Sequence, residues 1–220
     1  MSDVRERKTT IEASFSNVYV RISLLGLVAT LALLVDPLDS LADQNLTVHM
    51  FQHIGLFTGA AVFGYGLERY LSTHLVQLRK KFSLGYSALL SVIKFNTRTK
   101  GLVFAVLVPS FVFSYWHFPP NFDLAVVNGY VHILEHFSYI IAGSLVGLSI
   151  IAIPRKLRVI LLAIGFMQAG MMGSLMTLGT SFYTAYSATQ NMQMGTAIML
   201  FGAAGILITS SWLAKVLDIL

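Results

Sequence analysis

Residues 192–216 read MQMGTAIMLFGAAGILITSSWLAKV and carry no charged side chain before Lys215. A helix needs about 20 mainly apolar residues to cross the hydrocarbon core of a bilayer, and this stretch is long enough. Similar stretches precede it, so the sequence predicts an all-α, polytopic membrane protein with six transmembrane helices in one bundle. The predicted spans are Val18–Val35, Leu46–Tyr70, Gly101–Trp116, Leu124–Ile153, Leu157–Gly179 and Met192–Val216.

The composition of the 220-residue chain supports a membrane protein. Apolar residues make up 55% of the chain and charged residues 11%, whereas soluble domains carry about 25% charged residues. A soluble domain of this size could not bury so much apolar surface. The chain also has no cysteine, which excludes disulfides, iron–sulfur clusters, thiolate metal sites and cysteine catalysis.

The lysines and arginines indicate the orientation of the predicted helices. All 15 lie in the N-terminal region, the second and fourth connections and the C-terminal end, and the other three connections carry only acidic charges. Because basic loops stay in the cytoplasm, we expect a multi-pass protein of the cell membrane with both termini cytoplasmic. Residues 1–17 are then a cytoplasmic tail and residues 18–216 a single transmembrane domain. The one-sided charge also argues against nucleic-acid binding.

The second connection, Leu71–Lys100, is too long for a tight turn. Within it, Phe82–Phe95 reads FSLGYSALLSVIKF, which is apolar but only about half as long as a membrane span. We therefore expect an interfacial helix on the cytoplasmic face between the second and third spans, with basic residues at its flanks. A re-entrant segment is the alternative.

Two pairs of histidines fall on the side of the membrane opposite the basic connections. His49 and His53 open the second predicted span, and His132 and His136 lie in the outer half of the fourth. A spacing of four residues places both imidazoles of a pair on one face of a helix. Two such pairs could offer four nitrogen ligands to one metal ion, although each histidine could instead be a hydrogen-bonded packing residue.

Other polar residues extend this candidate site. Glu135 lies within the second histidine pair, and we expect it to accept an N–H from a ligating imidazole, with ligation or proton movement as alternatives. His117 closes the third predicted span and would serve at the mouth of the site. Four aspartates of the outer connections would concentrate cations there, namely Asp36, Asp39, Asp43 and Asp123.

Methionines favour copper as the metal. Met50 lies within the first histidine pair, and thioethers suit Cu(I) while imidazoles suit both oxidation states of copper. Two histidines four residues apart cannot both be axial ligands of one haem, although a haem bridging the two helices is an alternative. The predicted metal-binding residues are His49, His53, His132, His136, His117, Glu135 and Met50.

Three segments carry a resemblance to a known family. They are Val48–His53 (VHMFQH), the run from Trp116 to His136 that contains WHFP and HILEH, and Phe182–Tyr186 (FYTAY) followed by Gln193 and Met199. In order and spacing, across residues 45–205, they resemble the CtaG-type cytochrome c oxidase assembly factors. They are also similar to a related archaeal family of uncharacterised membrane proteins. The resemblance implies copper delivery to, or maturation of, a haem–copper oxidase.

We therefore expect a non-enzymatic protein of the lipid bilayer that delivers copper to a copper-containing oxidase or helps to mature it. Its partner would be a haem–copper oxidase or another copper-containing membrane enzyme complex. One intramembrane carboxylate and no evident substrate-binding set give little basis for an enzyme. The alternatives are an accessory structural subunit of a larger membrane oxidase or monooxygenase complex, and a haem-binding membrane protein.

Overall fold

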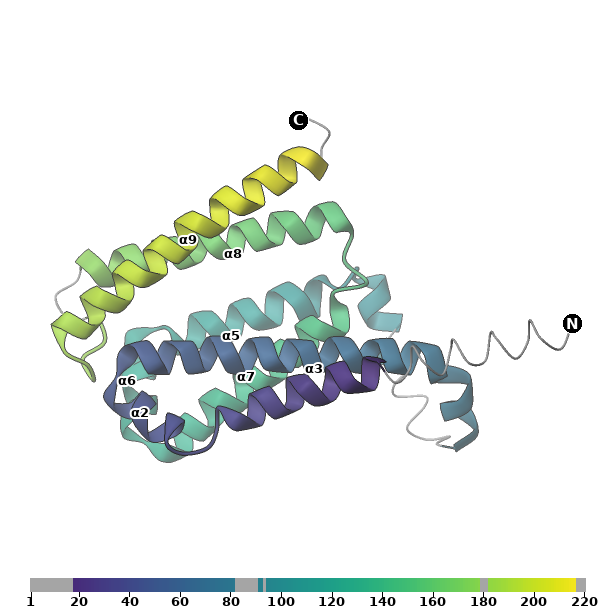
Figure 1. Ribbon diagram of the computed structural model, residues 1–220, viewed down its shortest axis with the longest axis horizontal. Helices are drawn as coiled ribbons and strands as arrows, with labels where there is room; N and C mark the ends of the chain where they lie inside the picture. The colour runs from purple at the N-terminus through teal and green to yellow at the C-terminus, as the bar shows by residue number, and fades with distance from the viewer. Residues whose placement is uncertain (1–17, 82–90, 93, 179–181, 217–220) are drawn as a thin grey trace, which may run out of the picture. The chain divides into compact units, whose positions relative to one another are not determined.

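The computed structural model describes residues 18–81, 91–92, 94–178 and 182–216 (Figure 1). Every regular element in these residues is helical, as the sequence predicts. An apolar helix, Val18–Ala32, comes first. The elements that follow are α2 (Leu38–Gln44), α3 (Leu46–Lys81), a π-helical turn (Val103–Leu107), α5 (Val108–Trp116), α6 (Pro119–Val127), α7 (Gly129–Ser149), α8 (Arg155–Leu178) and α9 (Ala188–Val216).

Four described helices are long and apolar enough to cross a membrane. They are Leu46–His74 within α3, all of α7, all of α8, and Ala188–Lys215 within α9. A fifth span is formed if Val103–Trp116 and Pro119–Val127, which are bent by 71° at their break, count as one. The described helices thus give four to five candidate spans and do not confirm six, because Val18–Ala32 is shorter than a full span.

The predicted span Leu124–Ile153 is wrong at its start. Residues up to Val127 belong to α6, and α7 begins only at Gly129, because the backbone of Asn128 is extended. The Asn128 side-chain oxygen accepts hydrogen bonds from the amides of Tyr130 and Val131. Such an N-cap satisfies amides that have no partner in the first turn of a helix, so Asn128 starts a new helix.

Other predicted boundaries are shifted. Helix α3 continues to Lys81, eleven residues beyond the predicted end at Tyr70. Helix α9 begins at Ala188 because the Ser187 hydroxyl accepts the amide hydrogen of Gln190 and caps the helix. Most of the predicted interfacial helix 82–95 lies outside the described residues.

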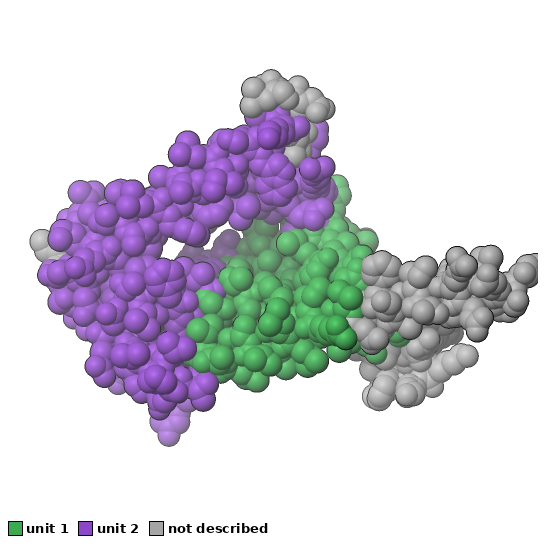
Figure 2. Space-filling view, in the orientation of Figure 1, with its two compact units in different colours: residues 1–33, 55–109, 138–152 green, residues 34–54, 110–137, 153–220 purple. Residues whose placement is uncertain are grey.

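The chain divides into two compact units, coloured separately in Figure 2. Unit 1 comprises residues 1–33, 55–109 and 138–152, and unit 2 comprises residues 34–54, 110–137 and 153–220. Helices α3 and α7 each contribute residues to both units.

Close helix contacts in unit 1 depend on glycine. Gly143 lies against the carbonyl group of Phe57, and Gly147 lies against the backbone of Ala61 and Tyr65. A side chain at either glycine would collide with the backbone of α3, so only glycine permits this approach of α3 and α7. The GxxxG spacing of the two glycines therefore serves helix packing.

Unit 2 contains the buried cluster that supports the candidate site. Its members come from α3, α6, α8, α9 and the segment between α8 and α9, namely Leu46, Met50, Phe122, Met176, Tyr183, Tyr186 and Met194. Helices α8 and α9 lie side by side in this unit (Figure 1). Gly173 contacts Gly195 and the backbone of Met199, so small residues again allow close packing.

Candidate metal centre

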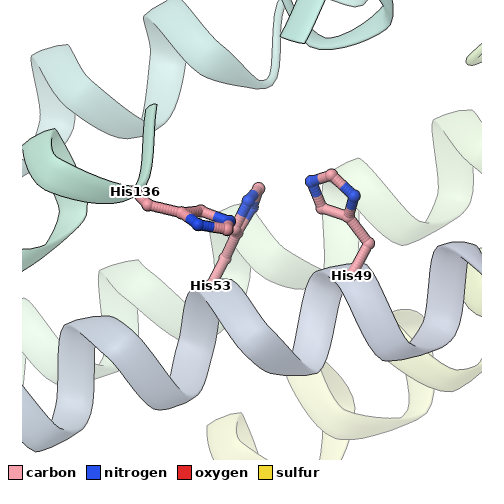
Figure 3. A group of neighbouring side chains, drawn as sticks. All are labelled: His49, His53 and His136. Atoms are coloured by element: carbon pink, nitrogen blue, oxygen red, sulfur yellow. The ribbon is translucent and has the colours of Figure 1, made fainter. Parts of the chain in front are cut away.

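The two histidine pairs meet in unit 2. Helix α3 carries His49 and His53, and α7 carries His132 and His136. The rings of His49 and His132 stack with their centroids 5.4 Å apart, and those of His53 and His136 are 5.5 Å apart. Figure 3 shows the rings of His49 and His53 rising from one helix toward the ring of His136 on another. The spacing of four residues predicts that each pair shares one face of its helix, and in the structure these faces of α3 and α7 point toward each other.

Glu135 lies among these histidines and is fully buried. One carboxylate oxygen is 3.7 Å from Nε2 of His49, and the other is 3.5 Å from Nε2 of His53. A buried carboxylate is costly unless a positive group or a metal compensates its charge. The position of Glu135 between two imidazole nitrogens therefore makes it a candidate ligand or charge partner of a bound cation.

His132 and His136 approach each other through equivalent atoms. Their Nε2 atoms are 2.9 Å apart, and both side chains are at least nine-tenths buried. Two neutral imidazoles can share this contact only when one of the two nitrogens carries a proton. Two nitrogens bound to one ion through bonds of about 2.0–2.1 Å lie about 3–4 Å apart. A small rearrangement would thus let both nitrogens bind one ion.

Several groups of side chains have the spacing that a metal requires. Ligand atoms of His49, His53 and His136 all lie within 4.8 Å of one another, and so do those of His49, His132 and Glu135. A third group with the same spacing contains Asp39 together with the two α7 histidines. The overlapping groups show that the same few side chains could hold an ion in more than one arrangement.

Tyr186 determines which nitrogen of His49 faces this cluster. Its hydroxyl group is 2.7 Å from the carbonyl oxygen of Ala42, to which it donates, and 2.9 Å from Nδ1 of His49. Burial raises the pKa of the Tyr186 phenol, so the hydroxyl keeps its only proton. Because that proton goes to Ala42, Nδ1 of His49 must donate to Tyr186, and Nε2 carries the lone pair.

The segment between α8 and α9 is held in place by two polar side chains. The Asp123 carboxylate accepts hydrogen bonds from the amides of Thr184 and Ala185 and from the Thr184 hydroxyl. The buried Asn191 amide accepts from the amide of Tyr183 and donates to the Tyr183 carbonyl, among others. These bonds fix the backbone beside Tyr186. Asp123 therefore has a structural role here, and its predicted attraction of cations stays a prediction.

His117 and Met50 lie beside the cluster. Nδ1 of His117 is 2.9 Å from the carbonyl oxygen of Phe113, and its ring centroid is 6.4 Å from that of His53. Among the described residues, His117 belongs to no group of three ligand atoms within 4.8 Å. Met50 is buried in the apolar cluster of unit 2. The structure thus brings together four of the predicted histidines with Glu135, places His117 beside them and packs Met50 in the apolar cluster of unit 2.

Three contacts of the histidine cluster involve residues outside the predicted metal-binding set. Sequence reasoning gave Tyr186 no role, and it treated Asp39 and Asp43 only as part of a diffuse negative charge. Oδ1 of Asp39 lies 3.9 Å from Nδ1 of His136, and Oδ1 of Asp43 lies 3.5 Å from Nδ1 of His132. The spacing of four residues between the aspartates, which matches that of the histidines, is a sequence signal that could have paired them.

Comparison with protein families matches residues 5–215 to the family described as cytochrome c oxidase caa3 assembly factor. No curated protein and no solved structure matches the chain significantly. The family match covers nearly the whole chain, including every helix of the candidate metal centre.

Proposed function

The chain belongs to the cytochrome c oxidase caa3 assembly factor family, and from this premise we propose that it binds copper and delivers it during oxidase maturation. Membership supports a role in the maturation of an oxidase and a non-catalytic, accessory activity. The family match does not itself identify copper as the ligand. Copper binding is proposed from the arrangement of the histidines and Glu135.

The observation that carries the proposal is the convergence of His49, His53, His132 and His136 on Glu135. Imidazole binds copper in both oxidation states, and the three nitrogens of His49, His53 and His136 have a spacing that suits a three-coordinate ion. If these histidines only packed two helices together, no buried carboxylate would be needed between them.

Charge favours a monovalent ion. A cuprous ion beside the Glu135 carboxylate gives a net charge of zero, which is the least costly charge state to bury. A divalent ion with the same ligands would leave one uncompensated positive charge in a buried site. The proposed cargo is therefore Cu(I), and Glu135 is its charge partner.

The proposal places the cluster in the outer leaflet of a six-span protein with both termini in the cytoplasm. The distribution of lysine and arginine supports this orientation, because the connections that carry the aspartates of α2 or adjoin the histidines contain no lysine or arginine. Copper bound there would be accessible to an oxidase subunit whose copper site lies on the outer side of the membrane.

The proposal can be tested in cells that lack the gene and depend on the oxidase. Wild-type protein should restore oxidase activity and the copper content of the oxidase, whereas His132→Ala/His136→Ala should restore neither at low external copper. The matched control is His74→Ala, since His74 lies in unit 1 and bonds only to residues of its own helix turn among the contacts described. Full restoration by the double variant, at equal protein level, would contradict the proposal.

An accessory subunit of a larger complex makes a different prediction. Such a subunit would purify with the oxidase at fixed stoichiometry and would remain necessary after the oxidase is assembled. A copper-delivering factor would be needed only during assembly, so its depletion after assembly should leave oxidase activity unchanged.

A further inference from the structure

The strongest feature outside the proposed binding centre is the contact between α2 and the two histidines of α7. Asp39 and Asp43 are four residues apart, so both side chains lie on one face of α2. Their carboxylates lie 3.9 Å from Nδ1 of His136 and 3.5 Å from Nδ1 of His132, respectively. Each α7 histidine therefore has one nitrogen toward a carboxylate and the other, Nε2, toward its partner histidine.

These contacts are arranged along a gradient of exposure. The side chains of Asp43 and Asp39 are 49% and 41% exposed. The two α7 histidines are nearly buried, and His49, His53 and Glu135 are at most 1% exposed. From the solvent inward, the order is thus the aspartate carboxylates, then the imidazoles of α7, and then the buried group of His49, His53 and Glu135.

Both separations exceed a hydrogen bond and fall within the range between two ligand atoms of one ion. An N–H···O bond to a carboxylate usually measures about 2.7–3.2 Å, which is shorter than both contacts. Two ligand atoms bound to one ion through bonds of about 2.0–2.1 Å lie about 3–4 Å apart. Asp39, His132 and His136 also offer ligand atoms that all lie within 4.8 Å of one another.

Gln52 holds one of the carboxylates in position. Its Nε2 atom, on α3, donates to Oδ1 of Asp39 over 2.8 Å. The Gln52 side chain is buried, so this bond holds the partly exposed Asp39 carboxylate against α3. An orienting bond of this kind is typical of residues around metal ligands.

We propose that Asp39, His132 and His136 form a second, outer copper position, with Asp43 beside Nδ1 of His132, and that the ion passes through this position to and from the buried cluster. This inference rests on the proposed function, because it assigns an uptake route to the same centre. Copper exchanges carboxylate oxygen for imidazole nitrogen as it moves inward, and the two α7 histidines serve both positions through their two ring nitrogens. No change in oxidation state is involved.

The test is the rate of copper exchange in the full-length protein in detergent. Cu(I) presented as its bicinchoninate complex is transferred to the protein in a stopped-flow instrument, and unloading is followed with excess chelator. In Asp39→Asn/Asp43→Asn, loading and unloading should both slow about tenfold or more, while the equilibrium affinity stays within about threefold. Glu68→Gln is the charge control, since Glu68 lies in unit 1 and belongs to none of the candidate ligand groups found among the described residues, and it should behave as wild type.

Three results would overturn the inference. Wild-type rates in the double variant would show that the carboxylates are not on the route. Faster unloading with unchanged loading would show that they only orient the histidines. Absence of copper binding by the wild-type protein would end the proposed function and this inference together, whereas the first two results would leave the proposed function intact.

A second variant examines the outer position directly. Cu(I) gives no electron paramagnetic resonance signal, so Cu(II) is added as a paramagnetic probe of the ligands. In His49→Ala/His53→Ala, this probe should still bind the outer position with a spectrum typical of mixed nitrogen and oxygen ligands. Adding Asp39→Asn/Asp43→Asn should abolish that signal. Retention of the same spectrum after loss of both carboxylates would contradict an outer position formed by α2.

Discussion

The Tyr186 hydroxyl lies 2.9 Å from Nδ1 of His49, a residue 137 positions away in the sequence. Because the same hydroxyl donates to the carbonyl of Ala42, His49 must donate from Nδ1 and present the lone pair of Nε2 to the cluster. Nε2 of His49 has no hydrogen-bond partner among the described residues. A residue between α8 and α9 thus sets the tautomer of a proposed ligand on α3.

Replacement of Tyr186 by phenylalanine should weaken copper binding about 10–100-fold, since it removes the acceptor that orients His49. It should also lower the free energy of unfolding by about 1–3 kcal/mol, because the Ala42 carbonyl loses its buried donor. Chelator competition measures the affinity and thermal unfolding measures the stability. Tyr130→Phe is the control, as Tyr130 is exposed. Equal affinities in the two variants would refute the role of Tyr186.

Packing of α8 against α9 depends on glycine at position 202. A Cβ atom there would lie 2.7 Å from Cα of Gly170 and from the carbonyl oxygen of Phe166. Gly202→Leu should therefore force the helices apart and destabilise the protein by about 1–3 kcal/mol. Gly165→Leu is a matched control on α8, because a Cβ atom at Gly165 meets nothing within 4 Å. Equal unfolding temperatures for the two variants would contradict this packing.

The number of spans can be measured because the chain has no native cysteine. If Val18–Ala32 crosses the membrane, a cysteine at Ser2 should react with an impermeant maleimide only in inverted vesicles, and one at Gln44 only in right-side-out vesicles. Ser72→Cys should behave like Ser2→Cys. Labelling of Ser2→Cys and Gln44→Cys from the same side would reject six spans with cytoplasmic termini.

Much of the candidate site could be predicted because its information is local. The spacing of His49 to His53 and of His132 to His136 fixes which face of a helix each pair occupies, whatever the rest of the chain does. Glu135 follows from the cost of a carboxylate in an apolar segment. That the two pairs oppose each other depends on packing between helices, which a single sequence does not specify.

The sequence does not predict features that depend on contacts between distant residues or on the capping of a helix end by a single side chain. Tyr186 contacts His49 only because Asp123 and Asn191 hold the segment that carries it. The start of α7 was misplaced because apolar residues continue through Asn128, and hydropathy is insensitive to a single capping residue. Helix α2 was expected to be part of a connection because it is short and acidic.

The most direct test of the account is the copper content of the purified protein. The protein is prepared in detergent without a chelator or polyhistidine tag, reconstituted with Cu(I), and analysed by mass spectrometry of the metal with an absorption spectrum. The account predicts near-stoichiometric copper in the wild type and in His74→Ala, and its loss in His132→Ala/His136→Ala. A wild type without copper, a double variant with undiminished copper, or a Soret band in place of copper would contradict it.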